Sequence, residues 1–181
     1  VGIDVNPDNV EAVNRGHSPI VEPGLHEAVG AAARAGRLRA TTSTAEAVRE
    51  SEVSLLCVGT PSRRNGSLDL QYLSRVSEQI GDALRDKAGY HVVVVRSTVL
   101  PGTTHDVVIP ALERHSGKRY GEDFGVAVNP EFLREGSALN DFREPPITLV
   151  GHNHAADAAA TIGLYEGVSA PLVTTGIRVA E

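Results

Sequence analysis

The chain has 181 residues, of which 41% are hydrophobic and 22% are charged, the balance of an ordinary globular domain. Its net charge of -6, with acidic and basic residues interspersed, argues against a general nucleic-acid surface. No apolar run approaches a membrane span, and no signal-peptide pattern opens the chain. Cys57 is the single cysteine, so an internal disulfide is excluded and we expect a cytoplasmic setting.

Apolar, Val-rich runs alternate with segments of helical periodicity along the whole chain. The expected strands are residues 1–5, 38–42, 53–58, 91–95, 124–128, 147–151 and 171–174. The expected helices are residues 7–15, 25–35, 45–50, 70–85, 107–112 and 155–165. This alternation predicts an α/β fold with a doubly wound, mostly parallel sheet. The chain has no methionine and opens in mid-strand, so we expect a fragment without its amino-terminal piece.

The run at residues 53–58 is almost continuously apolar, which predicts a central strand buried on both faces. Cys57 lies inside this run. We interpret its thiol as a small buried hydrophobe and not as a nucleophile, because no nearby cation or helix terminus would stabilise a thiolate.

Polar side chains follow three successive strands of the predicted sheet. Thr60 follows the first, Ser97 and Thr98 follow the second, and Glu131 and Glu135 follow the third. In an open α/β sheet, ligands bind at the carboxyl ends of the strands. The sequence therefore predicts a polar cleft that suits a polyhydroxylated ligand, and a kinase, a sugar epimerase or a nucleotide-binding module would all fit.

The segment Asn129–Ser137, directly after the expected strand 124–128, supports two interpretations. In one it is a polar loop with a helix N-cap and a surface ion pair. In the other, Phe132 and Leu133 exclude water from the site. The lower dielectric would then raise the pKa of a glutamate and make it a general acid or base.

Asp4, near the end of the first expected strand, also has two interpretations. An acid at the end of the second strand of a dinucleotide-binding fold binds the adenosine ribose hydroxyls. Taken alone, Asp4 fits better as a helix N-cap or a turn residue. The glycine-rich turn that precedes such an acid by about 20 residues is not in the chain.

Four motifs occur together in a fixed order. They are Ser-Pro-Ile-Val-Glu-Pro-Gly-Leu at 18–25, Val-Gly-Thr-Pro-Ser at 58–62, Arg-Ser-Thr-Val-Leu-Pro-Gly-Thr at 96–103 and Asn-Pro-Glu-Phe-Leu-Arg-Glu-Gly-Ser at 129–137. With them, the chain resembles the UDP-glucose/GDP-mannose 6-dehydrogenase family from its first residue to its last, and the GDP-mannose branch most closely. The resemblance implies a Rossmann-like NAD-binding domain over residues 1–181, without its first strand and glycine-rich turn and without the central helix and carboxyl-terminal domain.

The resemblance implies NAD-dependent oxidation of a nucleotide-sugar C6 alcohol to a carboxylate in two steps. An aldehyde forms first, a cysteine captures it, and a second hydride transfer gives a thioester that water hydrolyses. That cysteine lies outside this chain and Cys57 does not replace it, so we expect the piece alone to be inactive. The substrate would be GDP-mannose, or alternatively UDP-glucose. A different alternative is a non-catalytic nucleotide-binding fragment.

The resemblance also implies a role for individual residues and a setting for the parent enzyme. Glu131 and Glu135 would be catalytic, and no metal is implied. The NAD site would comprise Asp4, Asn9, Gly59, Thr60, Pro61, Ser97, Thr98, Val99 and Glu135. The nucleotide sugar would lie along Glu131, Phe132, Leu133, Arg134 and Glu135. The parent would be a cytoplasmic homo-oligomer of polysaccharide biosynthesis that binds neither nucleic acid nor membranes.

Overall fold

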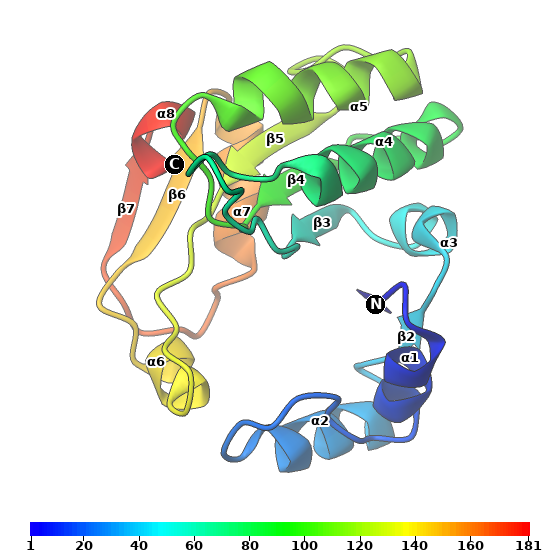
Figure 1. Cartoon of the computed structure of the whole chain (residues 1–181), viewed down its shortest axis with the longest axis vertical. Coiled ribbons are helices and arrows are strands. Elements are labelled where there is room, and N and C mark those ends of the chain that lie inside the picture. The colour runs from blue at the N-terminus through cyan, green and yellow to red at the C-terminus, as the bar shows by residue number, and fades with distance from the viewer.

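The computed structural model describes all 181 residues and contains two separate sheets (Figure 1). A two-stranded parallel sheet pairs β1 (Gly2–Ile3) with β2 (Ala40–Thr41). A five-stranded sheet has the order β3-β4-β5-β6-β7. Its strands are β3 (Val53–Leu56), β4 (Val92–Val95), β5 (Gly125–Val128), β6 (Thr148–His152) and β7 (Leu172–Thr175). Only β5 and β6 pair antiparallel, so the prediction of a mostly parallel α/β sheet is confirmed.

The chain has helices beside the two-stranded sheet and on both faces of the five-stranded sheet. They are α1 (Pro7–Asn14), α2 (Leu25–Arg34), α3 (Thr44–Arg49), α4 (Gln71–Arg85), η1 (Thr104–Val108), α5 (Ile109–Ser116), α6 (Ala138–Arg143), α7 (Ala155–Gly163) and α8 (Ile177–Ala180). Helices α4 and α5 lie on one face and α7 on the other (Figure 1). No helix is both long and apolar enough to cross a bilayer.

The β4 strand shows why the core forms where it does. Successive side chains of a strand point to opposite faces. Val93 and Val95 belong to the large core cluster with Leu73 of α4 and Leu112 of α5, whereas Val94 packs on the other face. A strand of four consecutive valines therefore supplies apolar side chains to both layers of helices, as expected for a strand that is buried on both faces.

The strand expected at residues 53–58 is shorter and more exposed than the sequence predicted. Strand β3 ends at Leu56 and pairs only with β4, because β1 and β2 form their own sheet. Leu55 is 48% exposed, and Cys57 lies beyond the strand as an exposed residue. The prediction that this strand is central and that Cys57 is buried was wrong. An apolar run alone does not distinguish an edge strand from a central one.

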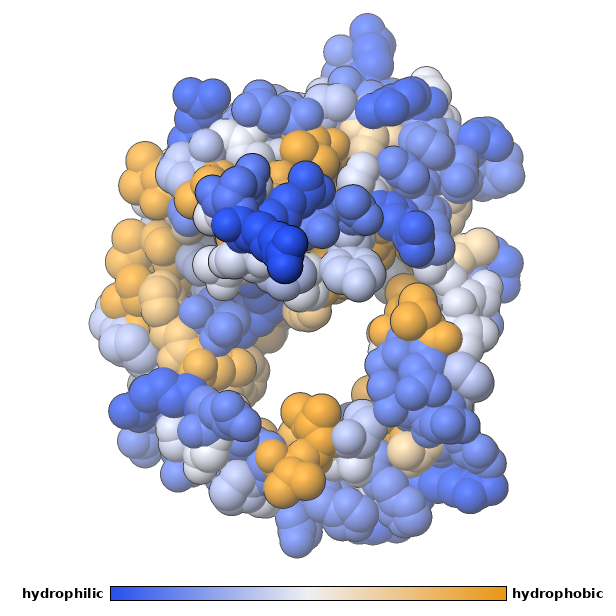
Figure 2. Space-filling model, in the orientation of Figure 1, coloured by the Kyte–Doolittle hydropathy of each residue, from blue (hydrophilic) through white to orange (hydrophobic).

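Residues 1–42 form a region without a hydrophobic core of their own. The only buried residues in it are Gly16 and Gly30, which pack against each other where α1 ends and α2 passes. Figure 2 shows an opening between this region and the five-stranded sheet. Figure 1 shows that the chain surrounds the opening, with α3 on one side and with α2 and α6 on the other.

Candidate functional site

The polar strand ends meet because β3, β4 and β5 are parallel and in register. Leu56 of β3 pairs with Val95 of β4, which pairs in turn with Val128 of β5. The loops that follow these strands therefore leave the sheet side by side, and the Thr60 hydroxyl donates a 2.6 Å hydrogen bond to the Thr98 carbonyl oxygen. The sheet places Thr60, Thr98 and Glu131 along one edge, and their parts in binding remain predictions.

Backbone contacts fix the shape of this edge. The Ser97 hydroxyl donates to the Val58 carbonyl oxygen at 2.6 Å and lies 3.2 Å from that of Leu56, so it joins the two loops. Val99 is buried behind them. Gly59 has no atom within 4 Å of where a β-carbon would stand. The backbone at Gly59 is therefore open to a ligand, next to the exposed Pro61.

The two glutamates of the segment 129–137 are exposed. A carboxylate oxygen of Glu131 accepts a hydrogen bond from the Leu133 amide, and the Glu135 side chain has no hydrogen-bond partner. Phe132 is 43% exposed and Leu133 is 36% exposed. The interpretation that these two side chains exclude water from a glutamate was therefore wrong for this chain, because the two apolar side chains and both glutamates are exposed.

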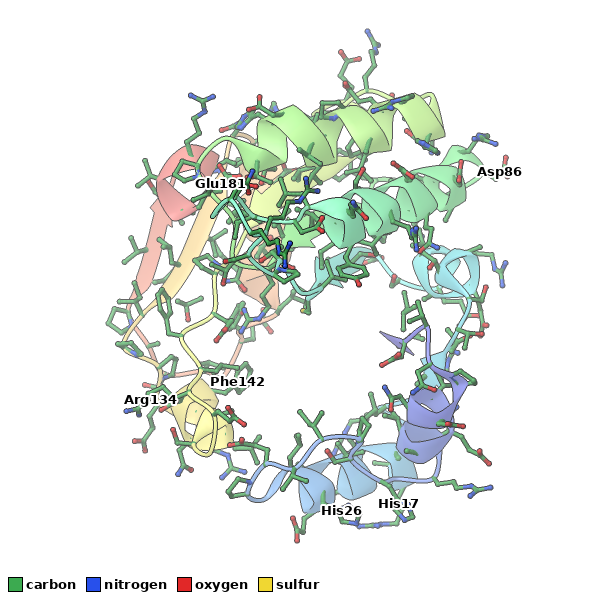
Figure 3. The ribbon with its side chains drawn as sticks, in the orientation of Figure 1. His17, His26, Asp86, Arg134, Phe142 and Glu181 are labelled. Atoms are coloured by element: carbon green, nitrogen blue, oxygen red, sulfur yellow. The ribbon has the colours of Figure 1, made fainter.

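The segment forms a surface ion pair, as the plainer interpretation predicted, with a partner in α6. Arg134 donates from its backbone amide, from Nε and from Nη2 to the Asp141 carboxylate, at 2.6 to 3.1 Å. The hydrogen bonds from Arg134 hold the pKa of Asp141 well below its usual range. Arg134 is 80% exposed at the side chain and lies at α6, as does Phe142 (Figure 3).

The structure adds a hydrogen-bond network that sequence reasoning missed. Nη1 of Arg96 donates to Oδ1 of Asn129 at 2.6 Å and to the Tyr165 hydroxyl at 2.7 Å, and that hydroxyl donates to the same Asn129 oxygen. Nδ2 of Asn129 donates to the Leu149 carbonyl oxygen of β6 at 2.8 Å. The network fixes the first residue of the segment beside a cleft of ≈ 30 Å³ that Glu131 also lines. The one sequence signal for this network was the asparagine at the strand end, Asn129.

Of the two local interpretations of Asp4, helix N-cap and turn residue, the structure supports the turn residue. Its carboxylate accepts from the Asn6 amide at 2.8 Å and from Nδ2 of Asn9 at 2.9 Å, while Asn6 caps α1. The Asn6 amide is the main cause of the lowered pKa of Asp4, and Asn9 adds to it. A carboxylate has about four acceptor positions, so the Asp4 side chain still has capacity for ribose hydroxyls. Asn9 orients it.

Cys57 lies at the same edge but lacks an activated thiol. The residue is exposed, and partial burial of the thiol raises its pKa. The Arg96 charge opposes that rise and the Glu131 charge adds to it. A thiol that stays protonated near neutral pH is a weak nucleophile, so the geometry gives Cys57 no catalytic role. The structure contains no group of three or more His, Cys, Asp or Glu side chains that could hold a metal ion.

Comparison with known proteins was made at the level of sequence and of structure. The sequence profile of the UDP-glucose/GDP-mannose dehydrogenase family, NAD binding domain, matches residues 1–169. The GDP-mannose 6-dehydrogenase of Azotobacter vinelandii is 54% identical over all 181 residues, which correspond to 42% of its length. A UDP-glucose 6-dehydrogenase of Haloferax volcanii is 40% identical, again over the whole chain and 43% of its own.

The fold of this chain also matches the solved structures of family members. A ternary complex of the GDP-mannose dehydrogenase of Pseudomonas aeruginosa superposes with a TM-score of 0.97 at 47% identity, over 99% of this chain and 41% of that one. The chain thus spans about 42% of the length of its curated relatives. It belongs to the UDP-glucose/GDP-mannose dehydrogenase family, and it carries that family's NAD-binding domain.

Proposed function

We propose that this chain is the cofactor domain of an NAD-dependent nucleotide-sugar 6-dehydrogenase, which oxidises the C6 alcohol of GDP-mannose to a carboxylate. The observation that carries the proposal is the single ligand edge at the ends of β3, β4 and β5, in a chain that aligns over its full length with GDP-mannose 6-dehydrogenases. The remainder of such an enzyme would supply the cysteine, since Cys57 is not suited to that role.

The residues at this edge, together with Asp4 of the two-stranded region, fit NAD. Asp4 offers carboxylate acceptors to the adenosine ribose. Gly59, whose surroundings are open, and the loop joined by the bond from Thr60 to Thr98 offer a surface to the nicotinamide half. Pro61, Ser97 and Val99 shape that surface. When bound, NAD accepts the hydride that leaves the sugar.

Glu131 and Glu135 are the acid–base groups of the proposal. Glu131 would move a proton on the sugar hydroxyl or on a water, and Glu135 would lie between sugar and cofactor. Phe132, Leu133 and Arg134 would line the sugar nucleotide, with Arg134 held in place by Asp141. Since both glutamates are exposed here, the substrate and the rest of the enzyme would provide the cover that lowers the local dielectric.

The substrate assignment follows the sequence identities. The GDP-mannose 6-dehydrogenases are 47% to 54% identical to this chain, and the UDP-glucose enzymes of Haloferax volcanii and Bacillus subtilis are 40% and 34% identical. UDP-glucose is therefore the second candidate. We also infer that the parent enzyme is a cytoplasmic homo-oligomer that makes uronic acid precursors of polysaccharides.

A chimera tests the proposal. Residues 1–181 would replace the aligned segment of the Azotobacter vinelandii enzyme, whose remaining chain supplies what this one lacks. An alcohol that becomes a carboxylate loses four electrons, so the chimera should form two NADH per GDP-mannose. It should turn over UDP-glucose far more slowly. A folded chimera that binds neither NAD nor GDP-mannose would contradict the assignment, and one that binds NAD without turnover would favour a non-catalytic nucleotide-binding module.

A further inference from the structure

Glu22 makes a contact that the ligand edge does not explain. Its carboxylate accepts two backbone hydrogen bonds from a segment more than 110 residues away: Oε2 from the Gly136 amide at 2.9 Å, and Oε1 from the Ala138 amide at 2.8 Å. Gly136 is the second-to-last residue of the segment 129–137, which contains Glu131 and Glu135, and Ala138 begins α6. We name these two bonds the Glu22 clasp.

The clasp is the one polar connection across the opening. No other hydrogen bond or ion pair connects residues 1–42 with residues 51–181. Elsewhere residues 1–42 are joined to the five-stranded sheet through α3, where Arg39 and Thr41 both bond to Glu46. The chain thus forms a ring, which α3 closes on one side and the Glu22 clasp on the other (Figures 1 and 2).

The loop around Glu22 is built to hold this position. Pro19 and Pro23 restrict the backbone on either side of it. Gly24 has a φ of +75°, and a β-carbon there would stand 3.2 Å from Cδ1 of Leu139, so the loop packs directly against α6. A side chain at residue 24 would strain the backbone and crowd the Leu139 side chain of α6.

At the α6 end of the Glu22 clasp, the N-cap side chain does not accept the hydrogen bonds that the Glu22 carboxylate accepts. The first amides of a helix lack intrahelical partners, and Ser137 at the N-cap position of α6 bonds to Asp141 instead of capping the helix. From across the ring, Glu22 accepts from one of these amides, that of Ala138, and from the Gly136 amide just before the helix. Hydrogen bonds to a charged acceptor are stronger than neutral ones, so the loss of the charge should release the end of the segment 129–137.

We propose that Glu22 is a positioning residue, which holds the segment 129–137 in its ligand-binding conformation and sets the separation between Asp4 and Glu131 across the ring. The geometric part of this inference stands on the contacts alone. The catalytic part rests on the proposed function, because it assumes that NAD and the nucleotide sugar bind on these two sides.

Amide hydrogen exchange in the 181-residue chain tests the geometric part. Glu22→Gln replaces one acceptor oxygen by a donor NH2 group, so exchange at Gly136 and Ala138 should become about 10- to 100-fold faster. Glu22→Asp, which keeps the charge on a shorter side chain, should restore part of the protection. Glu27→Gln is the matched control, because Glu27 is exposed on α2 and has no hydrogen-bond partner. Amides of β4 report whether each variant is folded. Unchanged exchange at both amides in a folded Glu22→Gln chain overturns the proposal.

Kinetics of the chimera test the catalytic part. If Glu22→Gln lowers the ordered fraction of the segment to about one tenth, KM for GDP-mannose should rise about tenfold. The kcat at saturation should change far less, since the bound substrate reorders the segment, and Glu27→Gln should change neither. An active chimera whose KM is insensitive to Glu22→Gln overturns the positioning role. An inactive wild-type chimera instead contradicts the proposed function, and the exchange measurement then decides on the clasp alone.

Discussion

The five-stranded sheet and the region 1–42 are held together by different forces. The main core cluster joins 16 buried residues that all lie between Val48 and Ala180, so none belongs to the first 42 residues. In residues 1–42, the side chains of Val5 and Val21 are 90% and 101% exposed. The sheet is therefore stabilised by burial of apolar area, whereas the smaller region depends on α3 and on the Glu22 clasp. The ligand edge belongs to the sheet, whereas Asp4, the expected ribose acceptor, belongs to the smaller region.

Two truncations, one in the core and one in the smaller region, should show this difference most strongly. Phe124 is 0% exposed in the main cluster, whereas Ile3 is 43% exposed on β1. Phe124→Ala removes a ring and leaves a cavity, which typically costs about 3–5 kcal/mol of unfolding free energy. Ile3→Ala should cost less than about 1 kcal/mol because its side chain is already half in water. Urea titration of both variants measures this, and equal losses would show that the small region shares the core.

At acidic pH, His91 should lower the free energy of unfolding of the chain. Burial is the main cause that lowers its pKa to about 4, with a further contribution from Lys87. Its ring nitrogens lie 2.9 Å from the Ser54 hydroxyl oxygen and 3.0 Å from the Ser51 carbonyl oxygen. A histidine in the unfolded chain has a pKa near 6.5. The unfolded state thus binds the extra proton between these values, and stability falls as pH drops below about 6.5.

The loss should reach about 2–3 kcal/mol at pH 4.5, from about 1.4 kcal/mol for each pKa unit. Urea titrations at pH 7 and pH 4.5 measure it in the wild type and in His91→Gln. The variant lacks the titrating group and should lose less stability than the wild type by this amount. Equal losses in both proteins would assign the acid sensitivity to other groups.

The smallest expected effect is on the rate at which Cys57, just beyond the edge strand β3, is alkylated. Because the residue is exposed, one equivalent of iodoacetamide should modify it in the native chain. The raised thiol pKa leaves less thiolate at pH 7.5, so the rate should be several-fold below that of an unstructured peptide thiol. If labelling requires urea, Cys57 is buried in the native chain, and the assignment of β3 as an exposed edge strand is wrong.

Most of the fold followed from local patterns, and its long-range contacts did not. Consecutive valines at 92–95 predicted a strand, and the structure shows that this strand is buried on both faces. The run at 53–58 has the same appearance, yet β3 is an edge strand, because strand order is a tertiary property. Helix α6 was missed, since it has six residues and little apolar periodicity.

In the candidate site, too, local features were predictable and long-range contacts were not. The polar residues at three strand ends were predictable, because parallel strands bring their carboxyl ends to one edge. The bonds from Arg96 to Tyr165 and from Glu22 to Ala138 join residues 69 and 116 positions apart. No local pattern in a single sequence indicates such a pairing. The exposure of Glu131 was also unpredictable, because it depends on the path of the loop 129–137 between β5 and α6.

The central claim is that Glu131 performs proton chemistry at this edge. The test is kcat of the chimera with Glu131→Gln, under conditions in which chemistry limits turnover. A general acid or base contributes about 100- to 10,000-fold, so kcat should fall within that range. The nearly isosteric amide should leave binding of GDP-mannose almost unchanged.

Two further variants complete this measurement. Glu135→Gln should shift the apparent affinities for NAD and for GDP-mannose together, because that side chain would lie between the two ligands. Glu144→Gln, at an exposed position after α6, should behave as the wild type. A kcat of Glu131→Gln that equals the wild-type value would contradict the account, and the general base would then lie outside this domain.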